Sequence, residues 1–148
     1  MLVEKRDACV YQTFKSADGF STLLEARRYS VNNGATWSEL EWENPPMVLD
    51  VEYRTTERFK NKAVYTVAFD FGNLPNATTK KITKQITFTE IVDIRGRVYG
   101  DIAYNPISNL SGLNDVWIGE GSNMIVNALT TEDMSSKTMT LTVKYTKD

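Results

Sequence analysis

The chain has 148 residues, with 17 basic and 19 acidic side chains and a formal net charge of −2 at pH 7. This length suffices for one domain with its own core, and the near-neutral balance offers no basic surface to nucleic acid. The single cysteine excludes an intrachain disulfide. No stretch approaches the ~20 apolar residues of a membrane helix, so we expect neither nucleic-acid binding nor membrane insertion.

The first 31 residues differ in pattern from the rest and are expected to form an amino-terminal attachment segment, residues 1–31. Ala8–Phe14 is typical of a strand, and Ser16–Gly19 of a turn. Ser21–Glu25 is close to the spacing of a helix capping box, which leaves a two-turn helix and a strand both open. Asn32-Asn33-Gly34 predicts a turn and marks the boundary to the main module.

The main module, residues 32–148, is dominated by a period of two. Apolar side chains alternate with others over Met47–Tyr53, Tyr65–Phe71 and Met139–Tyr145, which gives each predicted strand one apolar face. Lys60-Asn61-Lys62 predicts a hairpin turn between Val51–Phe59 and Ala63–Phe71.

Further breaks and short strands follow. Gly72–Asn76 is expected to interrupt the sheet, because glycine weakens a strand and proline donates no ladder hydrogen bond. Additional strands are predicted within residues 81–88, 91–94, 98–103, 116–118 and 123–129. Short strands separated by such turns and breaks predict an all-β fold, an antiparallel β-sandwich or barrel-like knob that follows the attachment segment.

The main module also carries a series of short motifs. These are Trp42, Asn44-Pro45-Pro46-Met47, Glu52-Tyr53-Arg54-Thr55-Thr56-Glu57-Arg58, Phe71-Gly72-Asn73-Leu74-Pro75-Asn76 and Val143-Lys144-Tyr145-Thr146-Lys147. In order and spacing, the series resembles the carboxy-terminal modules of bacteriophage and prophage tail-fibre or tail-appendage proteins, from about Asn32 to the last residue. The resemblance implies a virion structural protein that binds a receptor on the host-cell surface, a glycan or a protein.

The same resemblance implies further partners and a location. We expect a homotrimer, made in the cytoplasm of the bacterial host and built into the virion, which attaches to other virion proteins through residues 1–31. Both faces of Ala63–Phe71 are apolar, which a threefold interface or a monomeric two-layer sandwich would explain. The chain departs from the family pattern because it has no long shaft. The alternative is a head-fibre, capsid-decoration or connector-type protein with an assembly role.

Enzymatic function is not expected. The chain contains no histidine, which excludes the serine–histidine and cysteine–histidine arrangements, and it contains no phosphate-binding loop. We therefore expect no cofactor, and no metal because the EF-hand pattern is missing. The carboxylate pairs Asp93 with Asp101 and Asp115 with Glu120 leave a glycan-degrading enzyme as a third hypothesis, although solvated acidic loops explain them better.

Receptor-binding residues are expected in the glycine-rich region between Arg97 and Asn123, because binding residues concentrate in loops carried by a rigid scaffold. The candidates combine aromatic faces with amide and carboxylate groups, the mixture that suits a sugar ring: Tyr99, Tyr104, Asn105, Asn114, Asp115 and Trp117. The alternative is that Trp117 belongs to a buried strand against which the tyrosines pack. Trp37 and Trp42 form a second possible sugar-binding surface. A structural role for these two residues at the edge of the core is favoured.

Overall fold

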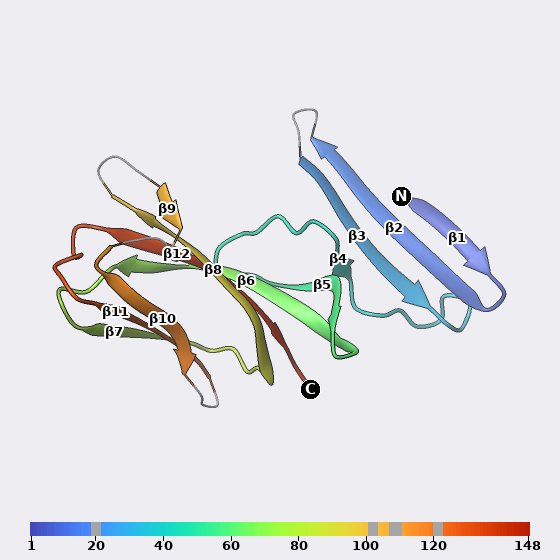
Figure 1. Cartoon of the computed structure of the whole chain (residues 1–148). Helices are drawn as coiled ribbons and strands as arrows, with labels where there is room; N and C mark the ends of the chain where they lie inside the picture. Colours follow the sequence, from blue (N-terminus) through green and yellow to red (C-terminus); the bar gives the residue numbers. More distant parts are fainter. Residues whose placement is uncertain (19–21, 101–103, 107–110, 120–122) are drawn as a thin grey trace.

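In the computed structural model, the described residues are 1–18, 22–100, 104–106, 111–119 and 123–148 (Figure 1). The side chains of residues 16–18, 22, 23 and 104–106 are not described. The described strands are β1 Leu2–Arg6, β2 Cys9–Asp18, β3 Thr22–Ser30, β4 Glu41–Trp42, β5 Glu52–Phe59, β6 Lys62–Asn73, β7 Thr79–Lys84, β8 Glu90–Tyr99, β9 Tyr104–Pro106, β10 Leu113–Gly119, β11 Met124–Thr130 and β12 Thr138–Thr146. The prediction of an all-β fold is confirmed. No helix in the described ranges is long and apolar enough to cross a membrane.

The strands form two sheets. The large sheet has nine strands in the order β1-β2-β3-β4-β5-β6-β12-β8-β9, and the small sheet has three in the order β10-β11-β7. The large sheet is mixed, because β4 pairs with β5 in parallel through Trp42 and Thr55, whereas the small sheet is antiparallel. Together the two sheets make a sandwich.

The hydrophobic core lies between the small sheet and the β6, β12 and β8 part of the large sheet. Along β12 the side chains alternate, so that Met139, Leu141, Val143 and Tyr145 are each at most 1 % exposed. They meet inward residues of β6, β8, the small sheet and two connections in one cluster: Val67, Phe69, Phe71, Leu74, Val98, Leu113, Met124, Val126, Ala128 and Met134. Burying an aliphatic or aromatic side chain of this size contributes about 1.5–3 kcal/mol. This cluster therefore holds the two sheets together.

The hairpin of β5 and β6 is confirmed. Lys60 and Asn61 connect the strands with φ angles of +50° and +65°, the left-handed pair that matches the twist of a two-residue hairpin. The expected break after Phe71 lies slightly later, because Gly72, at φ +74°, accommodates a register shift opposite β12 and lets β6 continue to Asn73.

The predicted strand over Met47–Tyr53 is wrong for most of its length, since β5 begins only at Glu52. Met47 and Asp50 have φ angles of +52° and +60°, and the amide of Val51 donates to the carbonyl of Val48 at 3.2 Å. These left-handed residues fold the segment into a turn that a period-two pattern does not reveal.

The amino-terminal segment is entirely strand and turn where it is described. The helix considered for Ser21–Glu25 is wrong, because β3 begins at Thr22, and the turn expected from Ser16 is wrong up to Asp18, which still belongs to β2. Long cross-strand pairing from Val10–Ser30 to Asp18–Thr22 outweighs the local capping pattern. The turn at Asn32-Asn33-Gly34 is confirmed, with positive φ at Asn33 and Gly34.

The apolar character of both faces of β6 is explained within one chain. Tyr65, Val67, Phe69 and Phe71 face the small sheet, while Val64, Thr66 and Ala68 on the opposite face are only 1 %, 2 % and 8 % exposed. This pattern therefore no longer argues for a threefold interface, and the trimer stays a prediction.

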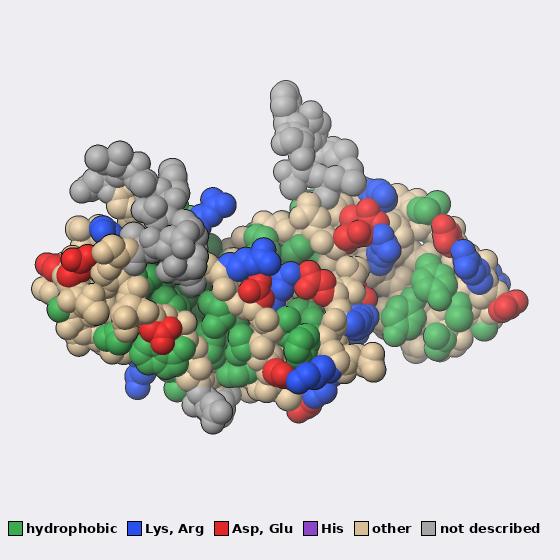
Figure 2. All heavy atoms as spheres, viewed as in Figure 1, with side chains coloured by type: hydrophobic (Ala, Val, Ile, Leu, Met, Phe, Trp, Pro, Cys, Tyr) green, Lys and Arg blue, Asp and Glu red, His purple; other side chains and the backbone are tan. Residues whose placement is uncertain are grey.

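Strands β1, β2 and β3 form a meander, here called the arm, that extends to one side of the sandwich (Figure 1). It joins the sandwich through the two-residue strand β4, which pairs with Ala26 and Arg27 of β3. None of the core cluster comes from the arm, and its apolar side chains Leu2, Val3, Tyr11 and Tyr29 are 42–55 % exposed. Figure 2 shows hydrophobic side chains at this end of the molecule.

Candidate functional site

The motif block on β5, Glu52–Arg58, forms a junction between the arm and the sandwich. Glu41 of β4 is 9 % exposed and contacts two arginines of β5, Arg54 at 3.0 Å and Arg58 at 2.6 Å. Arg54 also reaches Glu39 at 3.0 Å. The two arginines thus reach across to β4 rather than to Glu52 or Glu57 of their own strand.

The acidic residues of the same strand bind the end of β12. Glu57 pairs with Lys144, and Glu52 accepts a hydrogen bond from the Tyr145 hydroxyl and pairs with Lys147 at 2.5 Å. Burial, followed by the bond to Glu52, raises the pKa of Tyr145. The motif residues of β5 and β12 thus bond to neighbouring strands and to one another, which assigns them to the scaffold.

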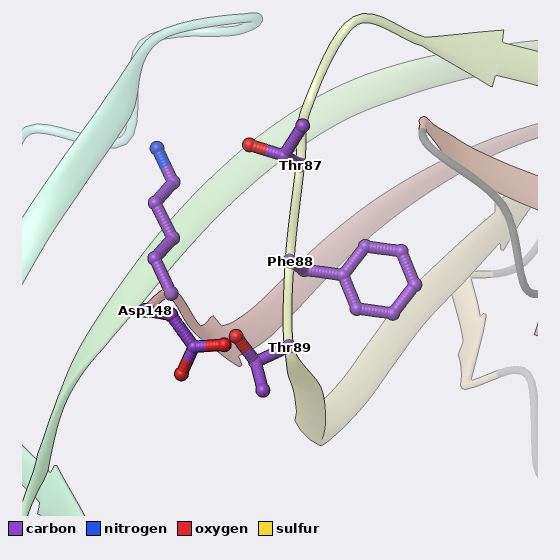
Figure 3. Close-up of a pocket in the computed structure, with 5 residues that line it drawn as sticks. Thr87, Phe88, Thr89 and Asp148 are labelled. Atoms are coloured by element: carbon purple, nitrogen blue, oxygen red, sulfur yellow. The ribbon is translucent and has the colours of Figure 1, made fainter.

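A shallow pocket of about 260 Å³ lies between the β7–β8 connection and the last two residues (Figure 3). Thr87 and Thr89 line it, while the ring of Phe88 points away from Asp148. The Asp148 carboxylate already accepts hydrogen bonds from Lys62 and Thr89, which lower its pKa, Lys62 most strongly. The main acidic group of the pocket is therefore occupied within the chain.

The predicted receptor-binding residues do not form one group. Tyr99 ends β8 next to the buried Val98, so it faces outward from the large sheet, where the Thr140 hydroxyl donates to its oxygen at 3.2 Å. Tyr104 and Asn105 lie in β9, whose backbone pairs with β8, and their side chains are outside the described part. The remaining candidates lie on β10, in the other sheet.

On β10, the inward and outward residues separate clearly. Val116 and Ile118 pack against the core, opposite Ala128 and Val126, so Asp115 and Trp117 point outward. Asn114 is exposed at a register shift of the strand. Trp117 is 36 % exposed, so the alternative of a buried Trp117 is wrong, although its two neighbours do pack inward. Asp115 and Trp117 are thus on the face opposite to that of Tyr99.

The outward face of the small sheet, here called the platform, is a grid of three rows across β10, β11 and β7. The rows are Asp115–Leu129–Thr79, Trp117–Asn127–Lys81 and Gly119–Ile125–Thr83. From standard strand spacings, its side chains spread over about 13 by 10 Å. The aromatic ring, an amide and two charges therefore share one small area.

Asn127 is the residue at the centre of the platform. It is 9 % exposed, and among the described residues its side-chain amide forms no hydrogen bond. A Cβ at Gly119 would lie only 3.3 Å from its amide nitrogen and 3.5 Å from Ile125. The missing side chain at Gly119 leaves the space into which the Asn127 amide points. Sequence reasoning missed both residues, and its only signal was a polar residue in the apolar run of β11.

The charges of the platform differ from most others of the chain. Asp115 and Lys81 are both exposed, and neither forms an ion pair within the described ranges. Many acidic and basic side chains elsewhere are paired, and such charges alternate over the middle of the face seen in Figure 2. Two unpaired charges of opposite sign therefore border Trp117 and Asn127.

The second aromatic pair has structural contacts. Trp42 is half-buried and meets the Tyr53 ring edge-on at 5.7 Å, while the Arg28 guanidinium lies 4.6 Å from the Trp37 ring. These contacts agree with the favoured role at the edge of the core. Such T-shaped and cation–π contacts each contribute roughly 0.5–1.5 kcal/mol.

Neither of the two candidate carboxylate pairs lies wholly within the described residues. Asp93 accepts a hydrogen bond from Arg95 at 2.6 Å, and Asp101 and Glu120, the expected partners of Asp93 and Asp115, lie outside the described residues. No group of three acidic or cysteine ligands occurs among the described residues.

No protein-family model, curated protein or solved structure matches the chain.

Proposed function

We propose that this chain is a binding and attachment module of a bacteriophage virion, of the tail-appendage type. The sandwich carries the surface that binds a host-cell receptor, and the arm attaches the module to its neighbours in the virion. The observation that carries the proposal is the division of the chain into a sandwich with its own core and an arm whose described side chains contribute nothing to that core.

The arm supports the attachment role. A three-stranded sheet needs an apolar face packed against something to be stable, and the arm instead leaves Leu2, Val3, Tyr11 and Tyr29 in contact with water. Tyr11 and Tyr29 are cross-strand partners, so both side chains lie on the same face of the arm. Exposed groups of apolar and aromatic side chains are typical of protein–protein contacts.

The motif series supports the virion assignment. Its residues join β4, β5 and β12 at the centre of the scaffold, which leaves the loop end and the outer faces of the sandwich free to vary with the receptor. The same arm favours a second candidate, a head-fibre or decoration protein that binds the capsid. Gold-labelled antibody on intact virions, viewed by electron microscopy, separates a tail location from a head location.

Receptor binding is tested with the full chain carrying a fluorescent label. The labelled chain is incubated with a panel of intact bacteria that differ in surface polysaccharide, and bound fluorescence is measured by flow cytometry. We expect saturable binding to a subset of strains, displaced by unlabelled chain. If no strain binds the chain saturably, the receptor-binding role is rejected and the decoration role takes its place.

A further inference from the structure

We propose that the platform on the small sheet is a saccharide-binding site, with Trp117 as the stacking surface and the Asn127 amide as the central hydrogen-bonding group. This inference rests on the proposed function, since it names the class of receptor and the place where it binds. The structure places the platform on a different face from Tyr99. It also adds to the platform three residues that the sequence did not indicate, Asn127, Lys81 and Gly119.

The first argument is the unused hydrogen-bonding capacity of Asn127. An amide has two donor hydrogens and an acceptor oxygen, and no protein group among the described residues occupies those of Asn127. The amide lies beside the gap at Gly119 and directly across from Trp117. A ligand that brings hydroxyl groups to this gap would satisfy the amide, because a hydroxyl both donates and accepts.

The second argument is the shape and chemistry of the surroundings. Trp117 offers an exposed aromatic face, and Ile125 and Leu129 are half-buried at the two sides of Asn127. A pyranose ring has an apolar C–H face bordered by hydroxyl groups, so its face suits the indole and its edge suits the amide. Thr79 and Thr83 place two further hydroxyls at the β7 side.

The third argument concerns charge. Lys81 and Asp115 contribute one positive and one negative charge to the platform, so its net charge is zero. A strongly anionic polymer would gain from Lys81 but would be repelled by Asp115. The platform therefore fits an uncharged saccharide, whose hydroxyls can donate to Asp115 and accept from Lys81.

The test uses the full chain on an array of immobilised bacterial polysaccharides and short oligosaccharides, both neutral and anionic. The dissociation constant for the best-bound soluble oligosaccharide is then measured by titration calorimetry. We expect binding to at least one neutral saccharide, weakened at least about tenfold by Trp117→Ala, as for an aromatic residue at the centre of a binding surface. Leu40→Ala, which removes a comparably exposed apolar side chain outside the platform, leaves the dissociation constant unchanged.

Asn127→Leu is the sharper variant, because leucine has a similar size and needs no hydrogen bond. We expect it to keep or raise the thermal unfolding temperature while it weakens saccharide binding about fivefold or more. The inference is overturned if the wild-type chain binds no neutral saccharide, or if Trp117→Ala and Asn127→Leu bind as tightly as the wild type. Binding to whole cells that survives both substitutions would overturn this site but leave the proposed function standing.

Discussion

At the scale of single residues, Tyr145 shows how the core and the scaffold motif are connected. Its ring is fully buried and stacks on Tyr65 with the ring centroids 6.1 Å apart, while its hydroxyl reaches the Glu52 carboxylate on β5. Lys147 holds the same carboxylate and lies 4.8 Å from the Tyr65 ring. One tyrosine therefore links the sandwich core to the strand that carries the arm.

This arrangement predicts a loss of stability at alkaline pH. Because burial raises the pKa of Tyr145 in the folded chain, its contribution is complete below the pKa of an unfolded tyrosine, about 10, and decreases as the pH rises above that value. Tyr145→Phe should cost about 1 kcal/mol at neutral pH, and this difference should shrink above pH ~10. Urea unfolding of the wild type and of Tyr145→Phe, from neutral pH to above pH ~10, measures the difference between their free energies of unfolding. A difference that does not change with pH would contradict the prediction.

At the scale of elements, β4 is the weak connection of the large sheet. It is two residues long, and its Glu41 holds Arg54 and Arg58 in a region where all three side chains are partly shielded from water. The attachment of the arm thus depends on charge-assisted hydrogen bonds more than on apolar packing, and strong salt should loosen it before it affects the core.

Glu41→Gln is expected to loosen the arm. The substitution removes the charge that both arginines share and should lower the free energy of unfolding by about 1–3 kcal/mol. Hydrogen–deuterium exchange should rise in β3 and stay slow in β12. Glu39→Gln is the matched control, because Glu39 pairs with Arg54 alone and its side chain is 68 % exposed, which makes its pair worth below ~1 kcal/mol. Equal exchange in the two variants would refute the role of Glu41.

The elements also explain what the sequence could and could not reveal. β12 was predictable because one of its faces meets the core and the other does not, which produces strict alternation. Met47–Val51 was not, because left-handed residues interrupt a segment whose pattern still alternates. Asp115 and Trp117 could be selected by residue type. Asn127 could not, since only the register of β11 places it between Trp117 and Lys81.

At the scale of the whole molecule, most of the large hydrophobic side chains that are exposed to water lie outside the sandwich. The exposed large side chains come chiefly from the arm and the turn before β5: Leu2, Val3, Tyr11, Tyr29, Val31, Val48, Leu49 and Val51. In a monomer with this distribution, the sandwich is stabilised by its own core, and the arm gains most from a partner. Association through the arm would also multiply weak receptor contacts by linking several copies.

The solution mass tests this distribution. Light scattering on a sizing column should give a mass near three times that of the 16.8 kDa chain, as the proposed trimer requires. Replacing Tyr11 and Tyr29 together by serine should shift the mass towards the monomer, because the pair forms the exposed aromatic surface of the arm. A wild-type monomer at micromolar concentration would contradict the trimer and indicate that the arm needs a different protein.

The lysines of β7 have a consequence for crowded copies of the chain. β7 is an outer strand of the small sheet, and an outer strand exposes backbone groups that invite pairing with another molecule. Lys80 reaches the carbonyls of Phe71 and Asn73, Lys84 pairs with Asp50, and Lys81 stays exposed. Lys80 and Lys81 therefore keep two positive charges without an acidic partner among the described residues on one short strand, so two such strands repel each other and close neighbours resist fusing their small sheets into amyloid-like fibres.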